Sequence, residues 1–268
     1  DVILNATAFA ASAPGEPRTP SILEQANCPI LQTMFASAEQ SAWQESARGL
    51  GPRDLAMHIA LPEVDGRIFT RAVAFKAAAR FDARTECSII VPQVLADRVS
   101  FVAQLARNWA TLGRAPAAER RVALVLANYP NRDGRIGNGV GLDTPESAAA
   151  ILRALGEAGY AIGDAPDQGA ALMQLMTGSE PTCALPLADY FAAFANLPEG
   201  VRRTVTERWG EPQDDPSCHD GAFRLRVHRF GNVAVAVQPS RGYDVDPKSS
   251  YHDPALPPPH AYLAFHIW

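Results

Sequence analysis

The segment VALVLANYPNRDGRIGNGVGLDTPESAAAILRALGEAGY, residues 122–160, contains a predicted strand, a long loop and a helix, in that order. Its first residues are β-branched and aliphatic, which is typical of a buried strand. Apolar residues recur at helical spacing from residue 145 to residue 158. A strand-to-helix connection usually takes about two to six residues, and this polar, glycine-rich one is much longer. The segment therefore predicts an α/β fold with a functional loop.

Strands and helices alternate along the rest of the chain, and the strongest helical pattern runs from residue 94 to residue 113. Such alternation favours parallel sheets covered by helices. We therefore predict an α/β fold of two lobes with mostly parallel sheets flanked by helices, joined by the long helix. The predicted parts are a first lobe (1–93), the connecting helix and linker (94–120) and a second lobe (121–268).

Shorter patterns complete this prediction. The sequence predicts a β-hairpin over 222–239, with its turn at 230–232, and a terminal helix from His260. The other strands are predicted at 2–7, 29–36, 86–92, 122–127 and 160–164. The other helices are predicted at 21–28, 39–47, 51–63, 145–158, 167–177 and 186–209.

The composition excludes several classes of protein. The chain has 268 residues, 47% apolar and 20% charged, with a net charge of -5, so it has no overall attraction to nucleic acid or an anionic membrane. The four cysteines are too far apart for a zinc cluster or a disulfide framework, and no membrane span or signal peptide is visible. We expect a cytoplasmic protein without nucleic-acid or membrane partners. Apolar residues at both ends lead us to expect a piece of a longer chain.

The loop over 128–144 has the composition of an anion-binding loop. Its glycines free backbone N–H groups, and the following helix, with Thr144 as predicted N-cap, offers its positive end to a carboxylate or phosphate. The pattern is neither a P-loop nor a GxGxxG fingerprint, and a surface loop without a ligand remains the alternative. The candidate binding residues are Asn131, Arg135, Gly137, Asn138, Gly139 and Thr144.

A second polar loop follows the hairpin, over 239–260. It combines carboxylate, imidazole, amide, phenol and guanidinium groups at the end of a strand, and loops at one edge of a parallel sheet line the ligand crevice. Each residue alone could instead be a turn or cap residue. The candidates are Gln238, Arg241, Tyr243, Asp244, His252 and His260. A third stretch, IALPEVDGRI (59–68), places Glu63 and Asp65 on one side if extended, as two oxygen ligands or a proton-handling pair. The alternative is a solvated turn after a helix, which the residues alone favour.

Three long motifs resemble one known family. They are DLAMHIALPEVDGRIFTRAVAFK (54–76), ALVLANYPNRDGRIGNGVGLDTPESAAAILRALGEAGY (123–160) and GNVAVAVQPSRGYDVDPKSSYHDPALPPPHAYLAF (231–265). The chain resembles, from end to end, the large subunits of aerobic ATP-dependent cobaltochelatases, and more distantly the H subunits of magnesium chelatases. The residues of the second motif and of YHDPALPPPH (251–260) are similar to those of the cobaltochelatase branch of the family.

The resemblance implies insertion of Co2+, the substrate metal, into hydrogenobyrinic acid a,c-diamide during cobalamin synthesis. It implies that ATP and Mg2+ are used by two partner subunits, one an AAA+ motor, while the tetrapyrrole is bound by the large subunit. In the family a histidine- and glutamate-bearing motif follows the terminal helix, so we expect the piece by itself to be inactive. The candidates for catalysis are Glu63, Asp65, His252 and His260, with His252 and Glu63 as metal ligands.

Three alternatives remain open from the sequence. An H subunit of a magnesium chelatase would perform the same chemistry on protoporphyrin. A non-catalytic scaffold would bind the motor subunits without touching the ring. A solute-binding protein would also have two lobes, although no signal peptide is visible.

Overall fold

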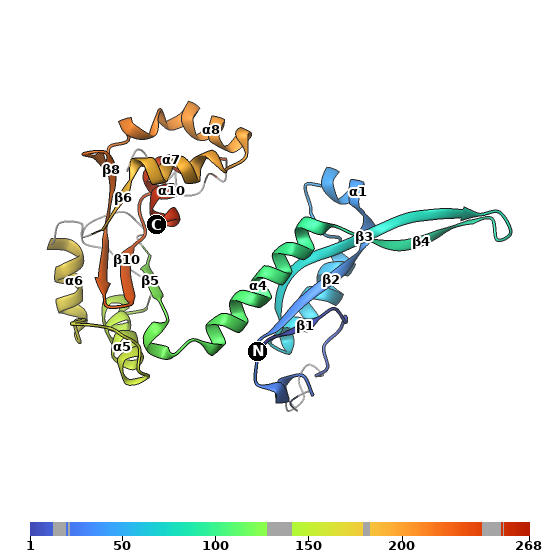
Figure 1. Ribbon diagram of the computed structural model, residues 1–268, viewed down its shortest axis with the longest axis horizontal. Coiled ribbons are helices and arrows are strands. Elements are labelled where there is room, and N and C mark those ends of the chain that lie inside the picture. The colour runs from blue at the N-terminus through green and yellow to red at the C-terminus, as the bar shows by residue number, and fades with distance from the viewer. Residues whose placement is uncertain (13–19, 21, 128–140, 179–182, 243–252, 254) are drawn as a thin grey trace. The chain divides into compact units, whose positions relative to one another are not determined.

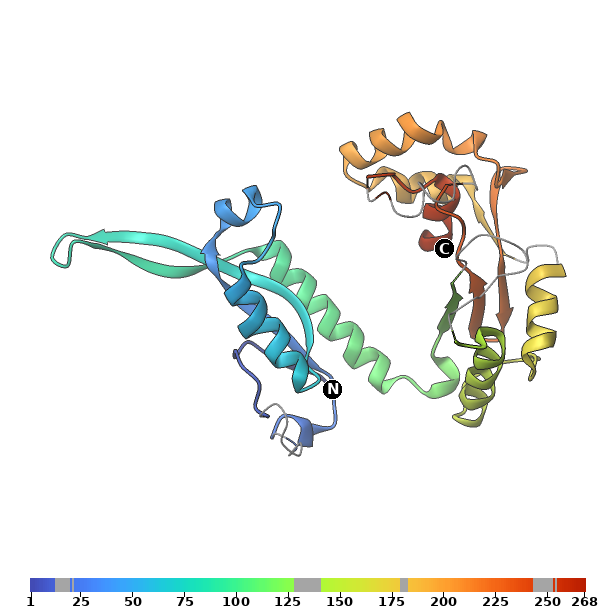
Figure 2. The ribbon, with the colours of Figure 1, turned by 180° about the vertical axis from the view of Figure 1, so that it is seen from behind.

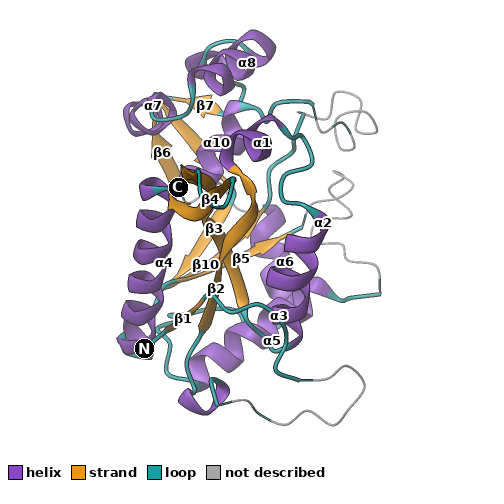
Figure 3. Cartoon of the chain, turned by 90° about the vertical axis from the view of Figure 1, so that its right-hand side faces the viewer, coloured by secondary structure: helices purple, strands orange, loops and turns teal. Residues whose placement is uncertain are grey.

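The computed structural model describes residues 1–12, 20, 22–127, 141–178, 183–242, 253 and 255–268. The chain divides into two compact units, Asp1–Ala115 and Pro116–Trp268. Both units combine helices with β-sheet (Figure 3). The expected α/β class is therefore confirmed.

Four strands form the sheet of the first unit, in the order β1-β2-β3-β4. β1 (Ile3–Asn5), β2 (Ile30–Glu39) and β3 (Ile68–Asp82) are parallel neighbours. β4 (Cys87–Val94) is antiparallel to β3 and forms a long hairpin with it (Figure 1). A 3-10 turn, Glu24–Ala26, precedes β2.

Helices connect β2 to β3, because parallel neighbours need a long crossover. The connection contains α1 (Gln40–Glu45), α2 (Pro52–Leu55), a π-helical segment (Ala56–Ala60) and α3 (Leu61–Val64). After β4, α4 (Ala96–Arg114) packs against β3 and ends the first unit.

The core of the first unit lies on β2 and β3. Met34, Ala36, Ala72 and Phe75 are buried together there. The Trp43 ring from α1 lies against Phe75, with centroids 4.9 Å apart. Apolar contacts of this kind hold the crossover helices against the sheet.

The second unit contains two sheets, and the first has the order β5-β10-β9. β5 (Val122–Leu126) is parallel to β10 (Val233–Val237), and β9 (Val227–Phe230) is antiparallel to β10. α5 (Thr144–Glu157) and α6 (Gly169–Gly178) share a core with this sheet.

The VAVAV sequence of β10 explains how this sheet packs, because successive side chains point to opposite faces. Its valines are buried in the core that includes α5 and α6. On the other face Ala236 packs in the same cluster as Ala261 and Ala264 of α10 (His260–Ile267). The small alanine side chains allow this helix to approach the strand closely.

The second sheet is antiparallel, in the order β6-β8-β7. Its strands are β6 (Cys183–Pro186), β8 (Ala222–Leu225) and β7 (Cys218–His219). α7 (Leu187–Ala195) and α8 (Glu199–Trp209) contribute to its core. The remaining 3-10 turns are Ala117–Glu119 and Pro212–Asp214.

The sheets differ in one respect from the prediction, because they are mixed and not mostly parallel. In the described part of the chain, β1-β2, β2-β3 and β5-β10 are parallel, whereas β3-β4, β9-β10, β6-β8 and β7-β8 are antiparallel. The hairpin connections were visible only in part from the sequence, and β3 and β6 were not predicted.

Three further expectations were wrong. The helix expected over 21–28 is only the 3-10 turn Glu24–Ala26. Residues 160–164 form no strand, and the carbonyl of Ala161 instead accepts a hydrogen bond from the Asn232 N–H at 2.7 Å, at the hairpin turn. Gly231 is needed there, since its φ is +56° and a Cβ would lie 2.5 Å from the Ala161 oxygen. The helix expected over 186–209 is divided into α7 and α8, because Pro198 restricts the preceding residue and ends the first helix.

Candidate functional site

The two long loops start side by side at one edge of a sheet. Leu126 and Val237 are opposite each other at the carboxyl ends of the parallel strands β5 and β10. The Gln238 N–H donates to the Leu126 carbonyl at 3.0 Å, so the pairing continues to the first loop residues. The carboxyl edge of a parallel pair is where α/β proteins bind ligands. We call this edge, with the loops that leave it, the loop edge.

A side-chain hydrogen bond joins the residue before the second loop to the helix after it. The Gln238 side-chain amide donates to the Tyr262 hydroxyl at 2.6 Å, so the end of β10 is joined to α10, which follows the loop. The Tyr262 ring lies 4.6 Å from the His266 ring, measured between centroids. Gln238 therefore joins the end of β10 to α10, and the sequence pattern gave no signal for its partner Tyr262.

His260, a predicted catalytic residue, is fully buried at the start of α10. Its Nε2 lies 2.9 Å from the Gly210 carbonyl, which can only accept, so Nε2 carries the proton. Its Nδ1 lies 2.6 Å from the Tyr190 hydroxyl. Burial, followed by the Asp215 carboxylate, raises the pKa of Tyr190, so this hydroxyl stays protonated and can donate to Nδ1. Because both nitrogens are engaged, this conformation gives His260 a structural role and leaves no nitrogen for a metal ion.

Two more contacts fix the end of the second loop. The Asp215 carboxylate accepts a hydrogen bond from the Ala261 N–H at 3.0 Å, in the first turn of α10. The Trp209 indole donates to the Pro257 carbonyl at 2.8 Å. Residues of α8 and of the segment after it therefore fix the chain where it enters α10. The sequence did not predict this role for Asp215 or Trp209.

We expect Tyr190→Phe to destabilise the contact between α7 and α10 by about 1–3 kcal/mol, since it leaves the buried His260 nitrogen without a donor. Native-state hydrogen exchange on the intact subunit measures this as a lower opening free energy of α10. Tyr160→Phe is the matched control, because its hydroxyl accepts from Arg120 at a partly exposed site. An unchanged opening free energy in Tyr190→Phe would contradict the structural role of His260.

The N-terminus of α5 differs from the prediction. Asp143, and not Thr144, is the N-cap, and its carboxylate accepts from the Glu146 N–H at 3.0 Å. Glu146 in turn accepts from the N–H of Gly169, the first residue of α6, at 2.7 Å. Two carboxylates of the protein already occupy the positive end of α5, which argues against an external anion there.

The predicted pair Glu63 and Asp65 is not extended, because Glu63 lies in α3 and Asp65 caps its end. Asp65 is 4% exposed and forms an ion pair with Arg67 at 2.9 Å. It also accepts from the Ala11 N–H at 2.6 Å and from Ser12. Asp65 therefore anchors the N-terminal segment and is not placed to transfer a proton, whereas the Glu63 side chain is exposed.

The other candidates are only partly described. Arg241 is partly exposed, three residues after Gln238. Within the ranges that the structure describes, no three His, Cys, Asp or Glu residues could hold a metal ion together, and no helix is long and apolar enough to cross a membrane. Outside the described residues lie the candidates Asn131, Arg135, Gly137, Asn138, Gly139, Tyr243, Asp244 and His252.

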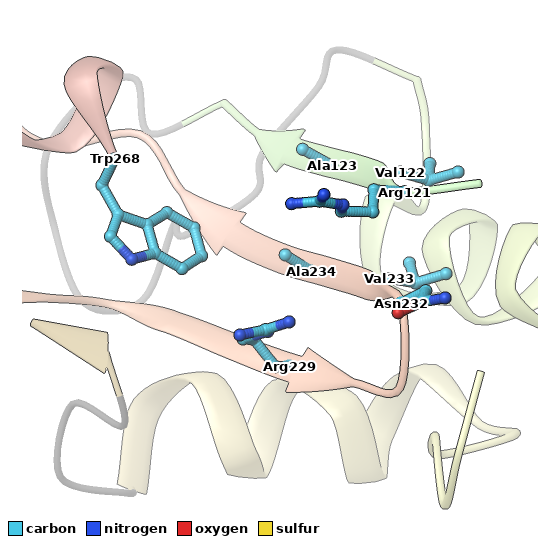
Figure 4. Close-up of a pocket in the computed structure, with 8 residues that line it drawn as sticks. All are labelled: Arg121, Val122, Ala123, Arg229, Asn232, Val233, Ala234 and Trp268. Carbon is cyan, nitrogen blue, oxygen red and sulfur yellow. The ribbon is translucent and has the colours of Figure 1, made fainter. Parts of the chain in front are cut away.

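A separate hollow of about 360 Å³ lies at the amino ends of β5 and β10 (Figure 4). Ala123 and Ala234 are opposite each other in the register, and Arg121, Arg229 and Trp268 also line the hollow. It lies at the other end of the strands from the loop edge. Its arginines therefore provide controls for any experiment on the loop edge.

The fold and the loop edge define an α/β protein in which two long polar segments follow neighbouring parallel strands. A family model described as CobN/Magnesium Chelatase matches residues 1–268, so the chain belongs to this family.

The chain is similar to named proteins over its whole length. It is 50% identical to the aerobic cobaltochelatase subunit CobN of Sinorhizobium sp. and 48% identical to that of Pseudomonas aeruginosa, and it covers 22% of each. It is 28% identical to the magnesium-chelatase H subunit of Rhodobacter capsulatus, over 84% of this chain and 20% of that one. A solved structure, the catalytic subunit of cobaltochelatase from Mycobacterium tuberculosis, has a TM-score of 0.80 and 34% identity, and is covered to 24% by this chain. The chain thus spans less than a quarter of the length of these relatives.

Proposed function

We propose that this chain is part of the tetrapyrrole-binding subunit of an ATP-dependent cobaltochelatase. The subunit inserts Co2+ into hydrogenobyrinic acid a,c-diamide, and partner subunits, one of them an AAA+ motor, hydrolyse ATP with Mg2+. The proposal rests on the loop edge, where two long polar loops start from paired positions. It is supported by the similarity to named cobaltochelatase subunits, which is much higher than that to magnesium-chelatase subunits.

The proposed binding mode follows from the chemistry of the substrate. A corrinoid precursor is a flat apolar ring with carboxylates and amides around it. Backbone N–H groups of loop 128–140 and the guanidinium of Arg241 would bind its carboxylates, and Tyr243 would cover part of the ring. Because α5 already carries Asp143 and Glu146 at its N-terminus, we assign carboxylate binding to the loop and not to this helix end.

Insertion of the metal requires that Co2+ loses water and that two ring N–H groups lose protons. Carboxylates and imidazoles perform both tasks, as transient ligands and as bases. Glu63 and His252 remain our proposed groups, because Asp65 and His260 are engaged in buried hydrogen bonds.

We expect Arg241→Ala in the intact subunit to weaken tetrapyrrole binding about tenfold or more, because it removes a charge-assisted hydrogen bond to a carboxylate. Arg229→Ala is the matched control, since it removes an exposed guanidinium at the opposite end of the same sheet. Titration followed by the absorption shift of the tetrapyrrole gives both dissociation constants. Equal weakening by the two variants would place the binding site elsewhere.

The same titration distinguishes the alternatives. Tighter binding of protoporphyrin than of hydrogenobyrinic acid a,c-diamide would favour a magnesium chelatase. An absorption shift that persists unchanged after replacement of residues 128–140 with a short glycine-serine linker would favour a scaffold that binds only the motor subunits.

A further inference from the structure

The outer part of the β3-β4 hairpin has nothing packed on it within the described residues. We call Lys76–Asp82 of β3 and Cys87–Pro92 of β4, with the turn between them, the outer ribbon (Figure 2). The buried part of β3 ends at Phe75, and no residue of the outer ribbon is buried. β2 pairs with β3 only as far as Lys76, so the outer ribbon is a two-stranded structure with two open edges.

The outer ribbon nevertheless exposes large apolar side chains, beside the charged Lys76, Arg80 and Asp82 of β3. Phe81 is 65% exposed, and Ile90 is 49% exposed. Ile90 lies opposite Ala78 in the register, and Phe81 lies opposite Ser88, on the same face of the ribbon. The neighbouring Val91 points to the other face and is 38% exposed.

The strand β4 therefore has the composition of a strand that is covered on both faces. Its SIIVP run, residues 88–92, is nearly continuous in apolar residues and does not alternate with polar ones. A two-stranded ribbon without a covering layer is at best marginally stable in water. Its open, apolar edges would also favour aggregation.

We infer that the outer ribbon is an interface and that another part of the same polypeptide covers it. Named relatives at 50% and 48% identity match this chain over only 22% of their length, so most of such a subunit lies outside these residues. A segment of the same polypeptide has a high effective concentration at the ribbon and covers it permanently. Permanent interfaces are more hydrophobic than transient ones and resemble a protein core, which fits the exposed apolar side chains of β3 and β4.

The full-length subunit tests this inference through cysteine labelling. All variants carry Cys87→Ser, because the exposed Cys87 is part of the ribbon and its Sγ lies 3.2 Å from the Thr85 hydroxyl. In this background Ile90→Cys and Phe81→Cys place thiols on the apolar face, and Thr85→Cys places one at the exposed turn as a matched control. In a dilute sample that light scattering shows to be monomeric, we expect a maleimide to label Cys at positions 90 and 81 at least about tenfold more slowly than at position 85. Peptide mass spectrometry assigns each labelled site.

The other outcomes overturn the inference. Equal labelling of the three sites in the monomer means that the ribbon is uncovered. Slow labelling that appears only at high protein concentration identifies a second copy as the occupant. Slow labelling that appears only after addition of the motor subunits identifies those subunits. None of these outcomes depends on whether the substrate is a cobalt or a magnesium tetrapyrrole.

Discussion

Asp65→Ala is expected to destabilise the first unit by about 3–5 kcal/mol, the cost of leaving one partner of a buried ion pair without the other. The Arg67 side chain is 5% exposed and lies 2.9 Å from the Asp65 carboxylate. Removal of the carboxylate also releases the N–H groups of Ala11 and Ser12. Native-state hydrogen exchange on the intact subunit measures the loss as a lower opening free energy of β1 and β3.

Glu63→Ala is the matched control for this prediction, because the Glu63 side chain is exposed two residues before Asp65. We expect it to change the opening free energy by less than about 0.5 kcal/mol. If Asp65→Ala behaves like this control, the anchoring role of Asp65 is wrong.

The effect of Asp65 depends on pH in a predictable direction. Burial alone would raise the pKa of Asp65, but hydrogen bonds from Ser12 and Ala11 and the charge of Arg67 lower it below its usual value. A carboxyl group whose pKa is lowered in the folded state contributes its full stabilisation of the fold above its unfolded pKa of about 3.9. This contribution is lost as the pH falls through the folded pKa. The stability difference between the natural protein and Asp65→Ala should therefore be constant near neutral pH and decrease below about pH 4.

Gly169→Ala is expected to destabilise the second unit by about 3 kcal/mol, near the upper end of the usual cost of overpacking. A Cβ at Gly169 would lie 2.5 Å from the Glu146 nitrogen and 2.8 Å from the Pro145 carbonyl carbon. These are backbone atoms in the first turn of α5, so the two helices would have to move apart. The Glu146 carboxylate would then lose its hydrogen bond from the Gly169 N–H.

Gly178→Ala provides the comparison in the same helix. Among the described residues, nothing lies within 4 Å of a Cβ at Gly178, the last residue of α6, so the substitution should be neutral or slightly stabilising. Opening free energies of α5 and α6 from native-state hydrogen exchange check both variants. A Gly169→Ala variant as stable as Gly178→Ala would show that the helices separate easily.

Local sequence patterns predicted elements whose apolar spacing is regular. The helix over 94–113 is found as α4, and the strand and helix on either side of the first long loop are found as β5 and α5. β3 was not predicted, because its AVAFKAAAR segment is rich in alanine and has no regular alternation. Pairing with β2 and β4 makes it a strand despite this local preference.

In the candidate site, too, local features were predicted from the sequence and features that depend on tertiary contacts were not. The two polar loops are visible in the sequence, because their length and composition are local properties. The roles of single residues are not, since burial depends on what other segments place beside them. His260 and Asp65 have the side chains of catalytic groups, yet Tyr190 and Gly210 engage the first, and Ala11, Ser12 and Arg67 engage the second.

The sequence by itself determined the α/β class, the position of both long loops and, through its motifs, the family. Only the tertiary structure decided that the loops start from paired positions at one sheet edge and that His260 and Asp65 are buried anchors. It also decided that the ribbon of β3 and β4 is left uncovered in this part of the chain. The physical reason is that periodicity and composition act over neighbouring residues, whereas strand pairing, burial and hydrogen bonds join residues that are far apart in the chain.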